Sequence, residues 1–152
     1  PYTLMQKDSA AQIIALFKRY RVSPAYITIE ITEEQAFSNA DTSMHNIQLL
    51  SEFGCAIAID DFGTGYANYE RLKSLQADIV KIDGCFVHEI ESDQLDAIIV
   101  KSIIEIARAK QLTVVAEYVE TEAQKAMLLA LGVDYLQGYL IGKPQPLSEL
   151  KA

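Results

Sequence analysis

The sequence predicts an α/β fold in which parallel strands alternate with helices along a single chain. Two observations indicate this class. Short runs of β-branched residues recur along the chain, and amphipathic stretches with apolar residues at helical spacing separate them. No internal linker, repeat or low-complexity tract interrupts the alternation. With 152 residues, 50% of them hydrophobic, the chain is expected to form one domain or part of one.

The expected elements alternate regularly. In chain order they are a helix over 9–20, a strand over 27–31, a helix over 41–53, a strand over 56–59, a short helix over 66–74, a strand over 79–82, a helix over 93–110, a strand over 113–116, a helix over 121–131 and a strand over 135–137. Ser9 and Thr121 can cap the helices that begin there, and Gly54 and Gly132 stop the helices that precede them. Each strand is a short run of mostly apolar residues that a polar residue ends.

Two architectures fit five short strands with intervening helices: an open doubly wound sheet and most of an eight-stranded barrel. Periodicity alone does not separate them. No glycine-rich phosphate loop of the GxGxxG or GxxxxGK[ST] type follows a strand, which removes the usual nucleotide-binding reason to prefer the open sheet.

Composition narrows the classes of partner. The 13 basic and 21 acidic residues give a net charge of −8, which argues against binding to polymeric nucleic acid, where a basic surface supplies most of the affinity. No apolar run is long enough for a membrane segment. Cys55 and Cys85 lie in or beside apolar strands and are expected to be buried free thiols in a reducing compartment. The chain begins at Pro1 without a methionine, which indicates a segment of a longer protein.

Two adjacent carboxylates, Asp60 and Asp61, come directly after an apolar strand and just before two glycines. Burying two like charges side by side is costly, so a fold that does so usually supplies a cation. The glycines indicate an open loop that a ligand can approach. The alternative is a solvated strand end followed by a turn.

Polar residues also end the other strands, on the face opposite the most apolar one, because side chains alternate across a strand. These residues are Glu30, Asp60, Lys81, Glu117 and Gln137. In a parallel α/β barrel they would converge at the carboxyl-terminal mouth, where active sites lie. Several converging carboxylates favour Mg²⁺ or Mn²⁺, and Asp60 can bridge two such ions about 3.5–4 Å apart if Asp61 reaches the same centre.

Other residue types weigh against different chemistry. His45 is expected mid-helix and His88 in a loop, both at the surface, so zinc is disfavoured. Lys81 can orient or deprotonate a nucleophilic water or balance the charge of a phosphate. Its alternative role is a strand-end lysine paired with Glu117 or Asp83.

Five strings agree in order and spacing with one known family. They are Ile29-Glu30-Ile31-Thr32-Glu33, Asp60-Asp61-Phe62-Gly63-Thr64-Gly65-Tyr66, Val80-Lys81-Ile82-Asp83, Val115-Ala116-Glu117-Tyr118-Val119-Glu120-Thr121 and Gln137-Gly138-Tyr139-Leu140-Ile141-Gly142-Lys143-Pro144. Along nearly the whole chain the sequence resembles the EAL-domain cyclic di-GMP phosphodiesterases of bacteria. The resemblance implies a TIM-like (β/α)8 barrel of the EAL type, of which residues 1–152 contain about the last five βα units. It also implies cytoplasmic hydrolysis of cyclic di-GMP to linear pGpG with Mg²⁺ or Mn²⁺.

The resemblance also implies roles for individual residues. The implied metal ligands are Glu30, Asp60, Asp61 and Glu117, the implied catalytic residues are Lys81 and Glu117, and the implied accessory or substrate-binding residues are Asp83, Glu120 and Gln137. Glu33 resembles the residue that anchors the loop from Phe62 to Asn68, which couples metal binding to formation of a homodimer.

Two departures from the family pattern are present. The sequence lacks the Glu-Ala-Leu motif and the asparagine strand that supply two further metal ligands, so the chain alone is expected to show weak or no catalysis. Tyr118 stands where the family usually has glycine and is expected to crowd the second metal, and Ala67-Asn68-Tyr69 stands where small serines are common.

Three functions therefore remain in view. The first is an active phosphodiesterase, and the second is a catalytically inactive EAL-type receptor of cyclic di-GMP or a protein-interaction module. The third is another metal-dependent barrel, such as an enolase-type enzyme, which also places acids and a lysine at strand ends.

Overall fold

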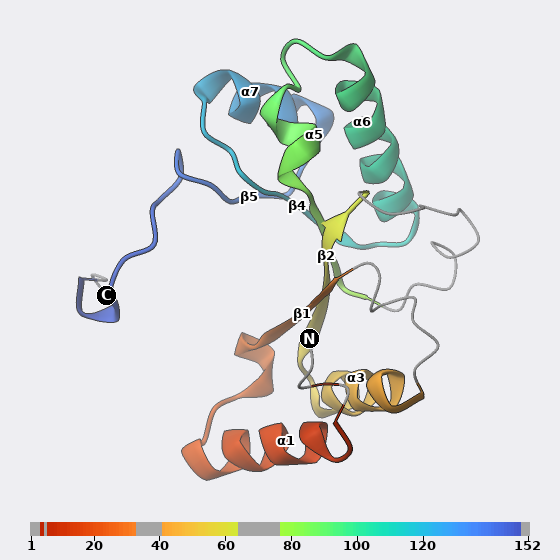
Figure 1. The fold of residues 1–152 in the computed structure, drawn as a ribbon, viewed down its shortest axis with the longest axis vertical. Helices are drawn as coiled ribbons and strands as arrows, with labels where there is room; N and C mark the ends of the chain where they lie inside the picture. The colour runs from red at the N-terminus through yellow and green to blue at the C-terminus, as the bar shows by residue number, and fades with distance from the viewer. Residues whose placement is uncertain (1–3, 5, 33–40, 64–76, 150–152) are drawn as a thin grey trace.

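The computed structural model describes residues 4, 6–32, 41–63 and 77–149, and its elements alternate along the chain (Figure 1). They are α1 (Ser9–Tyr20), the 3-10 helix η1 (Pro24–Tyr26), β1 (Thr28–Thr32), α3 (Asp41–Phe53), β2 (Ala56–Phe62), β3 (Ile79–Ile82), α5 (Gly84–His88), α6 (Gln94–Ala109), β4 (Thr113–Ala116), α7 (Glu122–Leu131), β5 (Tyr135–Leu136) and the 3-10 helix η2 (Leu147–Glu149). The expected α/β class is confirmed.

The strands form one sheet in the order β1-β2-β3-β4-β5, and every neighbouring pair is parallel. Helices α1 and α3 lie together near β1, whereas α5, α6 and α7 lie together near β3 and β4 (Figure 1). Because all strands are parallel and neighbours in sequence, their carboxyl ends lie along one edge of the sheet.

One face of the sheet forms the core. Its buried residues are Ile31, Ile57, Ile59, Val80, Ile82, Val114 and Ala116. Helix α6 covers them with Val100, Ile103 and Ile104, and each fully buried aliphatic side chain contributes about 1.5–3 kcal/mol. The opposite face carries the alternate residues of each strand, which include Glu30, Asp60 and Lys81.

Two aspartates at the amino-terminal ends of strands fix the register of their neighbours. Asp78 Oδ2 accepts a hydrogen bond from the backbone N–H of Ile57 at 2.8 Å, and Asp134 Oδ2 accepts one from Val114 at 2.8 Å. Each carboxylate therefore ties the loop before one strand to the start of the preceding strand in the chain.

Several local expectations are wrong. The helix-capping position before α1 is Asp8, and Ser9 is a buried first residue of the helix. Residues 84–88, expected as loop, form α5, because Asp83 caps a helix there, and His88 ends that helix at the surface. Cys55 is buried as expected, but Cys85 lies exposed in the first turn of α5.

Two further expectations concern the helix over 66–74 and membrane-spanning segments. The helix expected over 66–74 lies outside the described residues. Among the helices that the structure describes, none has the length and hydrophobicity needed to cross a bilayer.

Candidate active site at the carboxyl ends of the strands

The double aspartate lies at an irregularity in the pairing of β2 with β3. Ile59 pairs with Val80 and Phe62 pairs with Ile82, so β2 contains one residue more than β3 over this stretch. Asp61 has a left-handed φ of 54°, which short polar residues tolerate better than most. Because Ile59 and Phe62 are both buried in the core, the extra residue leaves both aspartates away from it.

Lys81 is the centre of a cluster of ion pairs. Its Nζ lies 2.8 Å from Asp60 Oδ1, 2.9 Å from Glu117 Oε1 and 3.1 Å from Glu30 Oε1. The Lys81 side chain is 6% exposed and that of Glu117 is 8% exposed, whereas Glu30 is 50% exposed. The structure thus brings together four of the five strand-end residues predicted to converge.

The ammonium group of Lys81 is held in its charged form. Burial acts to lower the pKa of Lys81, but hydrogen bonds to Asp60, Glu117 and Glu30 outweigh burial and raise the pKa above its ordinary value. Burial raises the pKa of Glu117, while Lys81 acts to lower it. In this set of ion pairs Lys81 is a charged donor that three carboxylates surround, which fits its expected role of orienting a water or balancing the charge of a phosphate.

Three carboxylates form a compact set of oxygen donors. One carboxylate oxygen each from Asp60, Asp61 and Glu117 lies within 4.8 Å of the others. Burial, and then the neighbouring charges of Asp60 and Asp83, raise the pKa of Asp61. Such crowding of like charges, with donors that are all carboxylate oxygens, suits a hard divalent cation.

Asp83, which lies near the carboxylate cluster, also caps helix α5. Its Oδ1 accepts a hydrogen bond from the backbone N–H of Cys85 at 2.8 Å and so caps α5. Partial burial acts to raise the pKa of Asp83, but hydrogen bonds from Cys85 outweigh it and leave the pKa below its ordinary value. Asp83 also interacts with the carboxyl group of Asp61.

The remaining expected site residues lie apart from the ion pairs of Lys81. Glu120 is exposed, and its backbone N–H donates to Gln124 Oε1 at 2.8 Å. Gln137 is exposed, and its backbone pairs with Ala116 at 2.8 Å and Val119 at 3.0 Å. Glu33 lies outside the described residues, as does all of the Phe62 to Asn68 loop beyond Gly63.

Gln124 holds the loop that follows Glu117, a role that the sequence analysis missed. This buried side chain accepts hydrogen bonds from the backbone of Glu120 at 2.8 Å and Thr121 at 3.0 Å, and donates to the carbonyl of His88 at 3.2 Å. The loop between β4 and α7 is thereby joined to the end of α5. The spacing of Thr121 and Gln124, which form a capping box, was the signal that could have revealed it.

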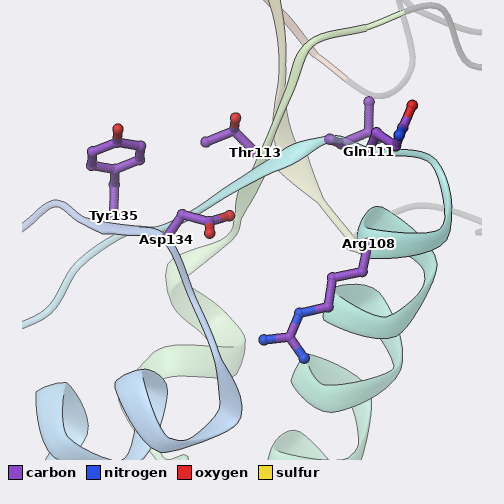
Figure 2. Close-up of a pocket in the computed structure, with 6 residues that line it drawn as sticks. Arg108, Gln111, Thr113, Asp134 and Tyr135 are labelled. Atoms are coloured by element: carbon purple, nitrogen blue, oxygen red, sulfur yellow. The ribbon is translucent and has the colours of Figure 1, made fainter.

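A pocket of about 510 Å³ lies at the other edge of the sheet (Figure 2). Arg108, Thr113, Asp134 and Tyr135 are among its lining residues, and Thr113 and Tyr135 begin β4 and β5. Because Glu117 follows the opposite end of β4, the pocket is separate from the carboxylate cluster.

The sequence matches the EAL domain family over residues 1–144. It is 66% identical over 149 residues to the probable cyclic di-GMP phosphodiesterase PdeA of Escherichia coli K12. The aligned region covers 98% of this chain and 20% of that protein. The chain thus spans about a fifth of the length of this relative.

Solved structures show the same fold. The PaMucR phosphodiesterase in complex with c-di-GMP superposes with a TM-score of 0.87 at 40% identity, covering 95% of this chain and 58% of that one. A manganese/cy-diGMP complex of BlrP1 from Klebsiella pneumoniae superposes with a TM-score of 0.81 at 30% identity. The superposition covers 89% of this chain and 34% of the BlrP1 chain. These likenesses identify the fold as that of the TIM-like barrels of the EAL type rather than an open doubly wound sheet. The chain belongs to the EAL domain family.

Proposed function

We propose that the protein containing this chain hydrolyses cyclic di-GMP to linear pGpG with the help of divalent cations. The observation that carries the proposal is the buried Lys81, ion-paired with Glu30, Asp60 and Glu117 where parallel strands end. The relative named a probable cyclic di-GMP phosphodiesterase and the solved PaMucR complex with c-di-GMP support the choice of substrate.

Asp60, Asp61 and Glu117 would hold a divalent cation, with Glu30 as a further ligand of a two-metal site and Asp60 shared. Their donors fit the cation because all are carboxylate oxygens that lie close together. When bound, Mg²⁺ or Mn²⁺ supplies positive charge that stabilises a phosphodiester in the course of displacement at phosphorus. Manganese in the BlrP1 complex supports this class of ion.

Lys81 would act as a fixed cation. Its ammonium group donates hydrogen bonds, so it can orient an attacking water or the anionic phosphate, and its raised pKa keeps the proton in place. The proton that water loses must then pass to a carboxylate. Glu117 suits this step because it is a buried carboxylate beside Lys81, and burial raises its pKa. In the net reaction, the water oxygen forms a bond to phosphorus, one P–O ester bond breaks, and the released sugar oxygen takes up a proton and leaves as a hydroxyl.

Further parts of the proposal follow the family pattern. Asp83, Glu120 and Gln137 would be accessory or substrate-binding residues, and Glu33 would anchor the Phe62 to Asn68 loop at a homodimer interface. The five strands would be the C-terminal part of a (β/α)8 barrel, so residues 1–152 alone would turn over little or no substrate. The location would be cytoplasmic.

Production of pGpG by the full-length protein with Mg²⁺ or Mn²⁺ tests the proposal. The Asp60→Asn variant is the control, because it keeps the size of the side chain and removes one charge from the cluster. We expect turnover by the parent and a loss of at least 100-fold in the variant. If both are equally inert and the parent binds cyclic di-GMP tightly, the protein is a receptor rather than a hydrolase.

A further inference from the structure

Tyr118, directly after Glu117, is placed at the surface by its backbone. Its φ of 55° is in the left-handed region that few residues other than glycine adopt. In a regular strand its side chain would point away from Glu117 and into the core. Here Val119 takes the core position and is 0% exposed, while Tyr118 is 65% exposed.

Strand β2 ends with the same turn. Asp61 follows Asp60 with a φ of 54°, and Phe62 then returns to the core at 3% exposure. The two turns lie on either side of β3, since β2 and β4 both pair with it. The turn of β2 brings a second carboxylate to the cluster, and the turn of β4 presents an aromatic ring in the equivalent position.

The ring of Tyr118 lies against Gly84 at the start of α5. A Cβ built on Gly84 would lie 2.6 Å from Tyr118 Cγ and 2.9 Å from its Cβ, so a larger residue at 84 would displace the ring. Gly84 follows Asp83, whose carboxyl group interacts with that of Asp61. The ring therefore packs on the backbone of Gly84 and remains largely exposed, and the chain places it between a residue of the carboxylate cluster, Glu117, and the start of α5, which follows Asp83. It does not keep Glu117 from reaching Lys81, at 2.9 Å.

We propose that Tyr118 is a specificity-determining residue whose ring stacks on a purine base of the substrate. This inference rests on the proposed hydrolysis of a cyclic dinucleotide. In such a molecule a base lies near each phosphodiester, so a phosphate at the cluster brings a base toward the ring. The carboxylates and Lys81 recognise charge alone, whereas a supported, exposed aromatic face recognises a flat base. Stacking of this kind strengthens binding about 5- to 150-fold per base.

Three variants of the full-length protein separate stacking from a structural role. Tyr118→Phe keeps the ring, Tyr118→Leu removes the ring and keeps apolar bulk, and Tyr118→Gly removes the ring and relieves the left-handed backbone. We expect KM for cyclic di-GMP to stay within about twofold in the Phe variant and to rise at least about fivefold in both others, with kcat changed less than threefold. Thermal unfolding is measured on all three variants. The Gly variant relieves the left-handed backbone and the Leu variant keeps it, so an effect of stability on KM would separate these two variants, whereas loss of the ring affects both alike.

The outcomes decide the inference separately from the proposed function. Tyr118 is not a stacking residue if the KM values of the variants vary with their unfolding temperatures and not with the presence of the aromatic ring. The same holds if the Leu variant has the KM of the parent. In both cases the proposed hydrolysis is unaffected. If the parent has no turnover, the dissociation constants for cyclic di-GMP, measured by equilibrium dialysis, replace KM. The same ranking of variants then supports stacking in a receptor, and absence of binding by the parent overturns both proposals.

Discussion

Replacing Lys81 with methionine tests whether the ammonium group balances the buried carboxylates. Methionine keeps most of the length of the side chain and leaves the carboxylates without their shared cation. Removing one partner of a buried ion pair costs about 3–5 kcal/mol. The Lys81–Glu117 pair meets this description, since the two side chains are 6% and 8% exposed. The pair with Glu30, which is 50% exposed, adds little, because exposed pairs contribute about 0–1 kcal/mol.

We therefore expect the loss of Lys81 to destabilise the sheet by about 3 kcal/mol in the absence of divalent cations. Amide hydrogen exchange of β3 in the full-length protein measures this locally, and about 3 kcal/mol corresponds to exchange roughly 100-fold faster. Lys125→Met is the matched control. Lys125 lies 3.1 Å from Glu122 within one helix, and both side chains are exposed by more than a third, so its loss should change exchange by less than about 0.5 kcal/mol.

The deficit should depend on pH with a definite sign. Burial raises the pKa of Glu117, and without Lys81 nothing in the ion-pair cluster opposes that shift. A carboxyl group whose pKa is higher in the folded state contributes stability that is present below its unfolded pKa and lost as the pH rises. The Lys81→Met deficit should thus be largest at neutral pH and shrink toward the ordinary Glu value of 4.5. Equal exchange in the Lys81→Met and Lys125→Met variants at neutral pH would refute the reasoning.

Three further predictions concern residues around the site. Asp134→Ala should speed exchange of the Val114 amide, since the carboxylate that accepts its hydrogen bond at 2.8 Å is lost, at a cost of about 1–2 kcal/mol; unchanged exchange would contradict this. Gln124→Ala should lower the unfolding free energy by about 2–3 kcal/mol in denaturant titration, because the backbone N–H groups of Glu120 and Thr121 lose their acceptor. Cys85 should react with a disulfide reagent near pH 8 about 50-fold more slowly than an ordinary cysteine. Desolvation and Asp83 raise its pKa to about 12, which leaves about 1,000-fold less thiolate, and the greater nucleophilicity of a more basic thiolate recovers a factor of about 20. A rate equal to that of a free cysteine would contradict the shift.

Strand parity predicted the ion-pair cluster from sequence, and the reason is geometric. Side chains alternate with a period of two, and neighbouring parallel strands end at one edge, so Glu30, Lys81 and Glu117 had to face one another once the strands were correctly placed. The extra residue of β2 was missed because the expected strand ended at Ile59, whereas the structure continues it to Phe62, which returns to the core after three residues instead of two. Helix α5 was missed because five residues are too few for helical periodicity to appear.

The left-handed backbone of Asp61 gives the last prediction, because it separates stability from function at one residue. This conformation costs a residue with a Cβ about 1–2 kcal/mol, which glycine avoids while losing about 0.5–1 kcal/mol of chain entropy. Asp61→Gly should therefore change stability by no more than about 1 kcal/mol, and crowding against Asp83 is relieved as well. Binding of Mn²⁺ by titration calorimetry should nevertheless weaken at least about tenfold, because one of three adjacent carboxylates is gone. Asp61→Asn is the comparison variant. It keeps the length of the side chain and one oxygen donor, so it should weaken Mn²⁺ binding less than Asp61→Gly does. Unchanged affinity in Asp61→Gly would show that the turn of β2 does not serve to bring Asp61 to a cation.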